Sequence, residues 1–273
     1  MLSLGFYLRT MAPIISLRQV CKSYGTKQVL GGIDLDIMPG QVIGYIGPNG
    51  AGKSTTVKIL CGLISDFEGE VEVAGINVRE DVLGVKRKIG YVPELAELYD
   101  VLTPREFLTL MAELYELPEA LAKERIEIMM QAIGLEAQID QRMDTFSKGM
   151  RQKVLIISGI LHNPEIIILD EPLSGLDANS VLIIKELIAQ LAREGKTIFY
   201  CSHMMDVVEK VSDRIILINQ GKVIAQGTIA ELREQSGNNT SLELIFSQLT
   251  SDESMNHAAA NILKAFQPSN STE

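Results

Sequence analysis

The sequence of 273 residues contains no tryptophan, and aromatic residues make up only 5% of it. It also lacks any apolar run close to the ~20 residues that a helix needs to cross a bilayer. The longest run, at residues 154–161, is interrupted by Ser158 and Gly159. We therefore expect no membrane span in this sequence. Because hydrophobic residues make up 46% and charged residues 22%, a fibrous or disordered chain is also excluded.

Positive charge is in deficit, with 25 Lys and Arg against 35 Asp and Glu, which gives a formal net charge of −10. General binding to nucleic acid needs many cations that neutralise phosphates, so no nucleic-acid partner is expected. A local anion site is still allowed. One basic cluster, Lys86, Arg87 and Lys88, is either a solvated face or a contact with a membrane partner or anionic headgroups.

Cysteine is scarce as well, since only Cys21, Cys61 and Cys201 occur. Their wide and irregular spacing indicates neither a disulfide framework nor a metal site, so we expect three buried thiols in a reducing cytosol. A signal peptide is not expected, because Arg9 follows the apolar part of the N-terminus and no small-residue cleavage site is present. Met11 is a plausible alternative start.

The strongest motif is a glycine-rich segment, GPNGAGKS at residues 47–54, which follows a short apolar run at residues 42–46. It fits the pattern G-x-x-x-x-G-K-[ST] between a strand and a helix. Backbone N–H groups and the helix start would surround a phosphate, and the glycines permit the turns that a Cβ would block. Lys53 would neutralise the β- and γ-phosphates, and the hydroxyl of Ser54 would bind Mg²⁺.

A second motif is an apolar strand that ends in two carboxylates, IIILDEP at residues 166–172. Such a strand delivers Asp170 and Glu171 to the carboxyl edge of a sheet, where ligands bind in open α/β folds. Asp170 would hold Mg²⁺ through a water. Glu171 would orient and polarise the attacking water as general base.

The hydrophobic pattern changes along the chain, from β-like at residues 14–73 to helical at about 95–160. The helical part begins with a capping box, formed by Thr103 and Glu106 around Pro104. From residue 166 onward strands alternate with helices, which indicates a parallel sheet covered on both sides. We therefore expect an α/β fold.

Two further patterns lie near the C-terminal end of the sequence. Asn219, Gln220 and Gly221 give a hairpin signal between two short strands. An apolar stripe at residues 242–249 either packs on its own domain or forms a contact with another subunit or a regulator. Residues 251–273 are expected to be mobile, apart from a short helix around 258–266.

The motifs and their order resemble the ATP-binding subunit of an ATP-binding cassette (ABC) transporter over roughly residues 14–234. The segment FSKGMRQ at 146–152 resembles the family signature, whose commonest form is LSGGQ. The segment SGLD at 174–177 matches the D-loop, and His203 lies where the family has its switch histidine. Tyr24 stands where an aromatic residue stacks on adenine, although a core tyrosine at a strand end is also possible.

The resemblance implies a P-loop NTPase (RecA-like) core with an N-terminal antiparallel β subdomain and an inserted α-helical subdomain. It divides the chain into an extension at 1–13, an ATPase domain at 14–235 with its helical part at about 95–160, and a partly disordered extension at 236–273. The implied catalytic residues are Glu171, His203 and Lys53. The implied nucleotide-binding residues are Tyr24, Gly47, Pro48, Asn49, Gly50, Ala51, Gly52, Lys53, Ser54, Thr55, Ser147, Gly149 and Asp177. The implied cofactors are ATP and Mg²⁺, with the metal at Ser54, Glu94 and Asp170.

Three residues depart from the commonest family pattern. Glu94 replaces a glutamine, and thereby loses the amide donor while it keeps the acceptor oxygens. Lys148 and Met150 depart from the commonest form of the signature, LSGGQ. The replacements at Glu94 and Lys148 are similar to those of the branch that is paired with separate exporter-type permeases. Taken alone, Ser147 would be an ordinary helix N-cap.

The resemblance also implies a head-to-tail dimer, in which Ser147 and Gly149 of one copy complete the site on Lys53 of the other. The dimer, of two identical chains or of two sister chains, would drive separate membrane permease subunits at the cytoplasmic face of the membrane. The alternative is the same ATPase in a DNA-repair or ribosome-associated machine, whose members usually have two cassettes or coiled-coil arms. A nucleotide sensor without hydrolysis is disfavoured by the presence of Glu171.

Overall fold

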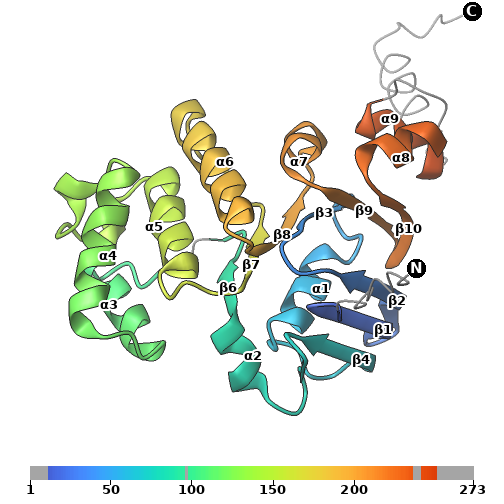
Figure 1. Ribbon diagram of the computed structural model, residues 1–273, viewed down its shortest axis with the longest axis horizontal. Coiled ribbons are helices and arrows are strands. Elements are labelled where there is room, and N and C mark those ends of the chain that lie inside the picture. The colour runs from blue at the N-terminus through green and yellow to red at the C-terminus, as the bar shows by residue number, and fades with distance from the viewer. Residues whose placement is uncertain (1–11, 96–97, 236–240, 251–273) are drawn as a thin grey trace, which may run out of the picture.

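The computed structural model describes residues 12–95, 98–235 and 241–250 of the chain. The expected alternative start at Met11, the mobile tail and its short helix around 258–266 lie outside these ranges. Figure 1 shows that the described chain forms two sheets, helices packed against them and a helical block at one end. Among the described residues, no helix combines the length and apolarity needed to cross a membrane.

The smaller sheet is antiparallel and has the strand order β2-β1-β4-β5. Its strands are β1 (Ile15–Tyr24), β2 (Lys27–Ile37), β4 (Glu68–Val73) and β5 (Ile76–Asn77). Alternation of apolar and polar residues sets one face of this sheet inward: Val71 and Val73 of β4 are buried, whereas Glu70 and Glu72 are exposed.

The larger sheet has the order β10-β9-β3-β8-β7-β6. Its strands are β3 (Val42–Ile46), β6 (Ile89–Val92), β7 (Ile166–Asp170), β8 (Thr197–Ser202), β9 (Arg214–Asn219) and β10 (Lys222–Gly227). All neighbours pair in parallel except β9 and β10. That antiparallel pair is joined through Gln220 and Gly221, whose φ angles are 47° and 74°, as a type I′ hairpin turn requires. The hairpin predicted from the sequence is thus confirmed.

Both faces of the larger sheet are covered, as expected from the sequence. The strands β3, β7 and β8 are buried along their whole length as a result. The helix α1 (Lys53–Leu60) shares one core with the smaller sheet, and α6 (Ala178–Arg193), α7 (Met205–Val211), α8 (Ile229–Gln235) and α9 (Leu242–Thr250) share the core on the other face. Leu242 and Ile245 of α9 are buried in that second core, so the stripe at 242–249 packs on its own domain.

The helical block consists of α3 (Pro104–Leu114), α4 (Glu119–Ala132), the short 3₁₀ turns η1 (Glu136–Gln138) and η2 (Met143–Thr145), and α5 (Lys148–Ile160). It has a hydrophobic core of its own. The capping box at its start is confirmed: the Glu106 N–H donates to Thr103 Oγ1 at 3.2 Å, and the Thr103 N–H donates to Glu106 Oε2 at 2.8 Å. The fold is therefore the predicted P-loop NTPase core with an antiparallel β subdomain and an inserted helical subdomain.

One expectation about the thiols needs correction, and the basic cluster can now be placed. Cys21 is only half-buried, because it lies on β1 of the smaller sheet, whereas Cys61 and Cys201 are buried as expected. The basic cluster lies at the end of α2 (Val82–Lys88), a helix that the sequence pattern did not indicate. Its charges are partly paired: Arg87 lies 2.9 Å from Glu116, and Lys88 lies 2.7 Å from Glu165.

Candidate nucleotide-binding site

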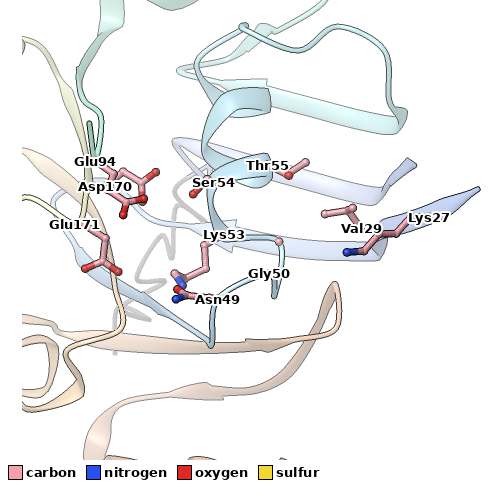
Figure 2. A pocket seen from close by; sticks show the side chains of 11 residues that line it. Lys27, Val29, Asn49, Gly50, Lys53, Ser54, Thr55, Glu94, Asp170 and Glu171 are labelled. Carbon is pink, nitrogen blue, oxygen red and sulfur yellow. The ribbon is translucent and has the colours of Figure 1, made fainter. Parts of the chain in front are cut away.

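A cavity of about 390 Å³ opens at the carboxyl ends of β3 and β7, beside the start of α1 (Figure 2). Register explains its position: Ile46 pairs with Ser202, and Asp170 pairs with Cys201, so three parallel strands end at one edge. The cavity is lined by Lys27, Val29, Asn49, Gly50, Gly52, Lys53, Ser54, Thr55, Glu94, Asp170 and Glu171. The structure thus brings residues from both predicted phosphate motifs together with Glu94.

The loop at residues 47–54 requires glycine at two positions for different reasons. Gly52 caps α1 with φ 110°, a conformation that side chains rarely adopt. The φ angle of Gly47 lies outside the left-handed region, but a Cβ there would lie 2.2 Å from the carbonyl oxygen of Ile218. Predicted residues Gly47, Pro48 and Ala51 belong to the loop without lining the cavity. The loop backbone therefore forms a cradle whose inner side stays open for an anion.

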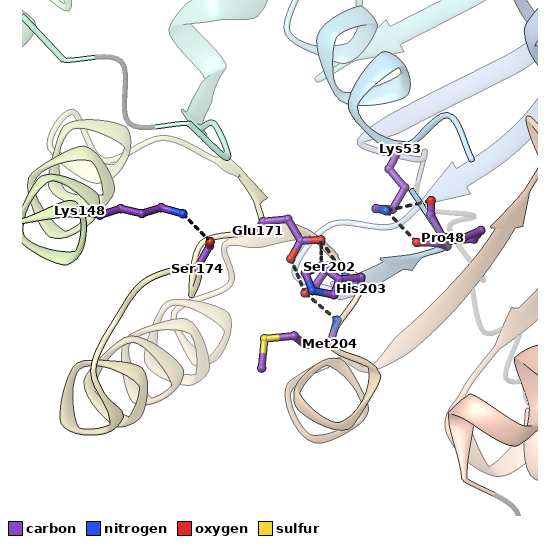
Figure 3. Close-up of polar contacts among 9 residues, drawn as sticks. Pro48, Lys53, Lys148, Glu171, Ser174, Ser202, His203 and Met204 are labelled. Atoms are coloured by element: carbon purple, nitrogen blue, oxygen red, sulfur yellow. Dashed lines mark hydrogen bonds and ion pairs between the residues drawn. The ribbon is translucent and has the colours of Figure 1, made fainter. Parts of the chain in front are cut away.

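Lys53 is the cation of this cradle, and only 7% of its surface is exposed. Its Nζ donates to the carbonyl oxygen of Gly47 at 2.7 Å and to that of Pro48 at 3.3 Å (Figure 3). These carbonyls hold the ammonium group at the cavity wall without neutralising its charge. A phosphate in the cavity would supply the missing countercharge.

Asp170 is buried at the cavity floor, with 3% of its surface exposed. Burial raises the pKa of its carboxyl group, and a hydrogen bond from Ser54 acts in the opposite direction. Its Oδ1 atom is buried without a hydrogen-bond partner. A buried carboxylate with one unsatisfied oxygen beside a hydroxyl suits a hard cation such as Mg²⁺. Within the described ranges no cluster of three or more His, Cys, Asp or Glu has metal-binding geometry, so phosphate oxygens and water would have to complete such a site.

Glu171 follows Asp170 in a left-handed backbone conformation with φ 49°. Its carboxylate accepts three hydrogen bonds (Figure 3): from Ser202 Oγ at 2.8 Å, from the His203 N–H at 2.8 Å and from His203 Nδ1 at 2.7 Å. The imidazole of His203 is mostly exposed, so it lies between Glu171 and solvent. The structure therefore places His203 in direct contact with Glu171.

The signature residues lie outside this cavity. Ser147 caps α5 by accepting a hydrogen bond from the Met150 N–H at 3.2 Å. A Cβ at Gly149 would lie 2.8 Å from the carbonyl oxygen of Gly175, so the start of α5 packs closely on the D-loop. Lys148 donates to Ser174 Oγ at 3.1 Å (Figure 3). The two halves of the predicted nucleotide site are therefore separate within one chain.

Two other predicted residues also lie away from the cavity. Asp177 caps α6, and its hydrogen bonds from Ser180 lower its pKa to about 2. Tyr24 ends β1 with half of its surface exposed, which excludes a core position, and its ring lies 4.9 Å from Lys22 Nζ. No sequence motif included Lys27 and Val29, which reach the cavity from β2. The only hint was their place just after the Tyr24 turn.

The comparisons with known proteins agree with this geometry. The family described as ABC transporter matches residues 30–174. The linearmycin resistance ATP-binding protein LnrL of Bacillus subtilis (strain 168) is 36% identical over 86% of this chain and 75% of its own length. A solved structure of an ATP-binding subunit of an ABC transporter superposes with a TM-score of 0.82 at 31% identity, over 87% of this chain and 99% of that one.

A second solved structure bears on the assembly. It is a dimeric, post-hydrolysis state of the ATP-binding cassette MJ0796 bound to ADP and Pi, with a TM-score of 0.74 at 27% identity, over 79% of this chain and 98% of that one. The family match, the relative and both solved structures agree with the site itself, a phosphate-binding loop beside two carboxylates. The chain therefore belongs to the ABC transporter family, as an ATP-binding subunit that hydrolyses ATP.

Proposed function

We propose that this chain drives a separate membrane permease by binding MgATP between two cassettes that meet head to tail. One observation carries the proposal: the cavity holds Lys53, Asp170 and Glu171, while Ser147 and Gly149 lie outside it on α5. A second copy that presents its α5 start would close the cavity. The dimeric relative MJ0796, bound to ADP and Pi, supports this arrangement.

Each group near the cavity has a role that its position supports. Lys53 and the loop backbone bind the phosphates, with Ser54 and Thr55 at the start of α1. Ser54, Asp170 and Glu94 hold Mg²⁺, which when bound offsets phosphate charge. Glu171 takes the proton of the attacking water, and His203 orients Glu171. From the partner copy, the start of α5 adds Ser147 and Gly149, and the D-loop adds Asp177.

We assign Tyr24 to the adenine, because its half-exposed aromatic ring at the end of β1 can stack on a base. Export is the favoured direction. The relative LnrL is named for resistance to linearmycin, and Glu94 and Lys148 resemble the exporter-type branch. We keep the predicted division into 1–13, 14–235 and 236–273 as part of this proposal, with the cassette at the cytoplasmic face of the membrane.

Disulfide crosslinking tests the head-to-tail dimer. Asn49 is the better site on the loop, because a cysteine at Gly50 would have to adopt φ 81°. In a Glu171→Gln background, Asn49→Cys combined with Ser147→Cys should give a crosslinked dimer with MgATP and little with ADP. Adding Lys53→Ala should abolish the crosslink. Equal crosslinking with ATP and with ADP, or none in the complex from native membranes, would refute the arrangement.

Copurification tests the transport role. The full chain carrying an affinity tag should bring down a polytopic membrane protein from detergent-solubilised native membranes, and that protein should raise the rate of ATP hydrolysis. Recovery with ribosomes or with DNA-repair proteins, and no membrane partner, would instead favour the non-transport alternative. The same preparation screened with candidate cargo compounds would identify those that stimulate hydrolysis.

A further inference from the structure

The end of β8 holds Glu171 through three consecutive residues. The Glu171 N–H donates to the Cys201 carbonyl oxygen at 2.9 Å, Ser202 Oγ donates to Glu171 Oε2 at 2.8 Å, and His203 donates to Oε1 from both its N–H and its ring. The carboxylate is buried, with 8% of the side chain exposed. Its two oxygens are thus bound separately, one by His203 and the other by Ser202.

Ser202 differs from His203 in burial. Only 1% of the Ser202 surface is exposed, whereas 63% of the His203 side chain is exposed. Ser202 Oγ also accepts a hydrogen bond from the Met204 N–H at 3.0 Å, just before α7. The hydroxyl is therefore fixed from both sides, as a donor to Glu171 and as an acceptor from the backbone that leads into α7 (Figure 3).

We propose that Ser202 is a positioning residue for Glu171: its buried hydroxyl fixes the direction of the carboxylate that activates water. The proposal rests on the proposed role of Glu171 as general base. Glu171 has a left-handed backbone conformation with φ 49°, which few side chains adopt without support. Without the hydroxyl, the buried Oε2 and the Met204 N–H would both lose this partner. The carboxylate would then be held at Oε1 alone, by the two donors of His203.

The prediction is a loss of turnover without a loss of ATP affinity. Ser202→Ala should lower kcat about tenfold while KM for ATP stays within about twofold, because a tenfold change in rate needs only a small loss of alignment. Ser202→Thr restores the hydroxyl on a β-branched residue suited to a strand, and it should recover most of kcat. A matched control is Ser158→Ala, since Ser158 is also buried but donates only to Leu155 of its own helix.

A double variant separates positioning from general damage. If Ser202 acts through Glu171, then Ser202→Ala added to Glu171→Gln should change the residual turnover by less than twofold. Should Ser202→Ala fail to unfold cooperatively, Ser202→Cys retains the volume but offers only a weak donor, and it should turn over several times more slowly than wild type.

The assays use the full-length chain in its native complex. Normal kcat in Ser202→Ala or in Ser202→Cys would overturn the inference, and so would a Ser202→Thr variant as slow as the alanine variant. Those outcomes leave the proposed function intact as long as Glu171→Gln is inactive. Normal turnover in Glu171→Gln would instead refute the role of Glu171 as base.

Discussion

The cavity edge of the larger sheet and the start of α5 both carry motifs of the family, yet they are built differently. Lys53, Asp170 and Glu171 lie on or beside buried strands, and each is at least 93% buried, with exposed fractions of 7%, 3% and 6%. Ser147 and Lys148 are exposed on the first turn of a helix. The first region gathers its groups inside one chain, whereas the second presents its groups outward. The proposed head-to-tail dimer would account for this difference, because a second copy would cover the second region.

The largest expected effect lies in the buried region. Glu171→Gln keeps the shape of the side chain but cannot accept a proton from water. We expect turnover to fall roughly 100- to 1,000-fold, which is the loss typical of a single group that stabilises a transition state. ATP affinity should stay within a few-fold, because the phosphate contacts remain. Steady-state hydrolysis and equilibrium binding of labelled ATP measure the two quantities.

A change where the larger sheet packs on the C-terminal end of α5 should be costly for stability. Gly90 of β6 packs directly on α5, and a Cβ there would lie 1.8 Å from the carbonyl oxygen of Gly159. A backbone oxygen cannot move aside as a flexible side chain can, so this clash should make Gly90→Ala lower the free energy of unfolding by about 3 kcal/mol. Gly31→Ala is the control, since its Cβ would meet only flexible side chains, those of Lys222 at 3.4 Å and Gln28 at 3.7 Å. For that variant, urea denaturation should show a loss of less than about 1 kcal/mol in the free energy of unfolding.

Lys53→Ala and Ser147→Ala sharpen the comparison further, because they affect different steps. Lys53 is the buried cation of the cavity, so its loss should weaken ATP binding by the isolated chain about 10- to 100-fold, as expected for a hydrogen bond to a charged group. Ser147→Ala should leave that affinity unchanged and lower turnover only where two copies meet. Titration of the isolated chain with a fluorescent ATP analogue checks both variants. Equal losses of affinity would contradict the separation of the two regions.

The sequence predicted much of this molecule because its signals were local. The strand at 166–170, the capping box at Thr103 and the glycine loop depend on neighbouring residues, and all three are present in the structure. Contacts between distant segments were not predictable in the same way. Lys27 and Val29 reach the cavity only because β2 folds back beside the loop. The contact of Ser202 with Glu171 depends likewise on the pairing of β7 with β8.

His162 illustrates the same limit, since no motif included it. It follows α5 and joins the helical block to the sheet: its ring stacks on Tyr115 with centroids 3.6 Å apart, and Nε2 donates to the carbonyl oxygen of Ile89 at 3.1 Å. Burial lowers the pKa of His162 to about 4. Its Nδ1 atom is buried without a partner, so a second proton there would be unsatisfied.

This pKa shift predicts a small dependence of stability on pH. Because the folded pKa of about 4 lies below the ordinary 6.5, His162 contributes its full share of stability above pH 6.5, and that share is lost as pH falls toward 4. Since the ring is partly exposed, solvent screening reduces the expected loss between pH 7 and pH 5 to about 1 kcal/mol. His162→Phe keeps the stack on Tyr115 but cannot take up a proton. Urea denaturation at both pH values should therefore show a smaller decrease in this variant than in the wild type, and an equal decrease would assign the pH dependence to other groups.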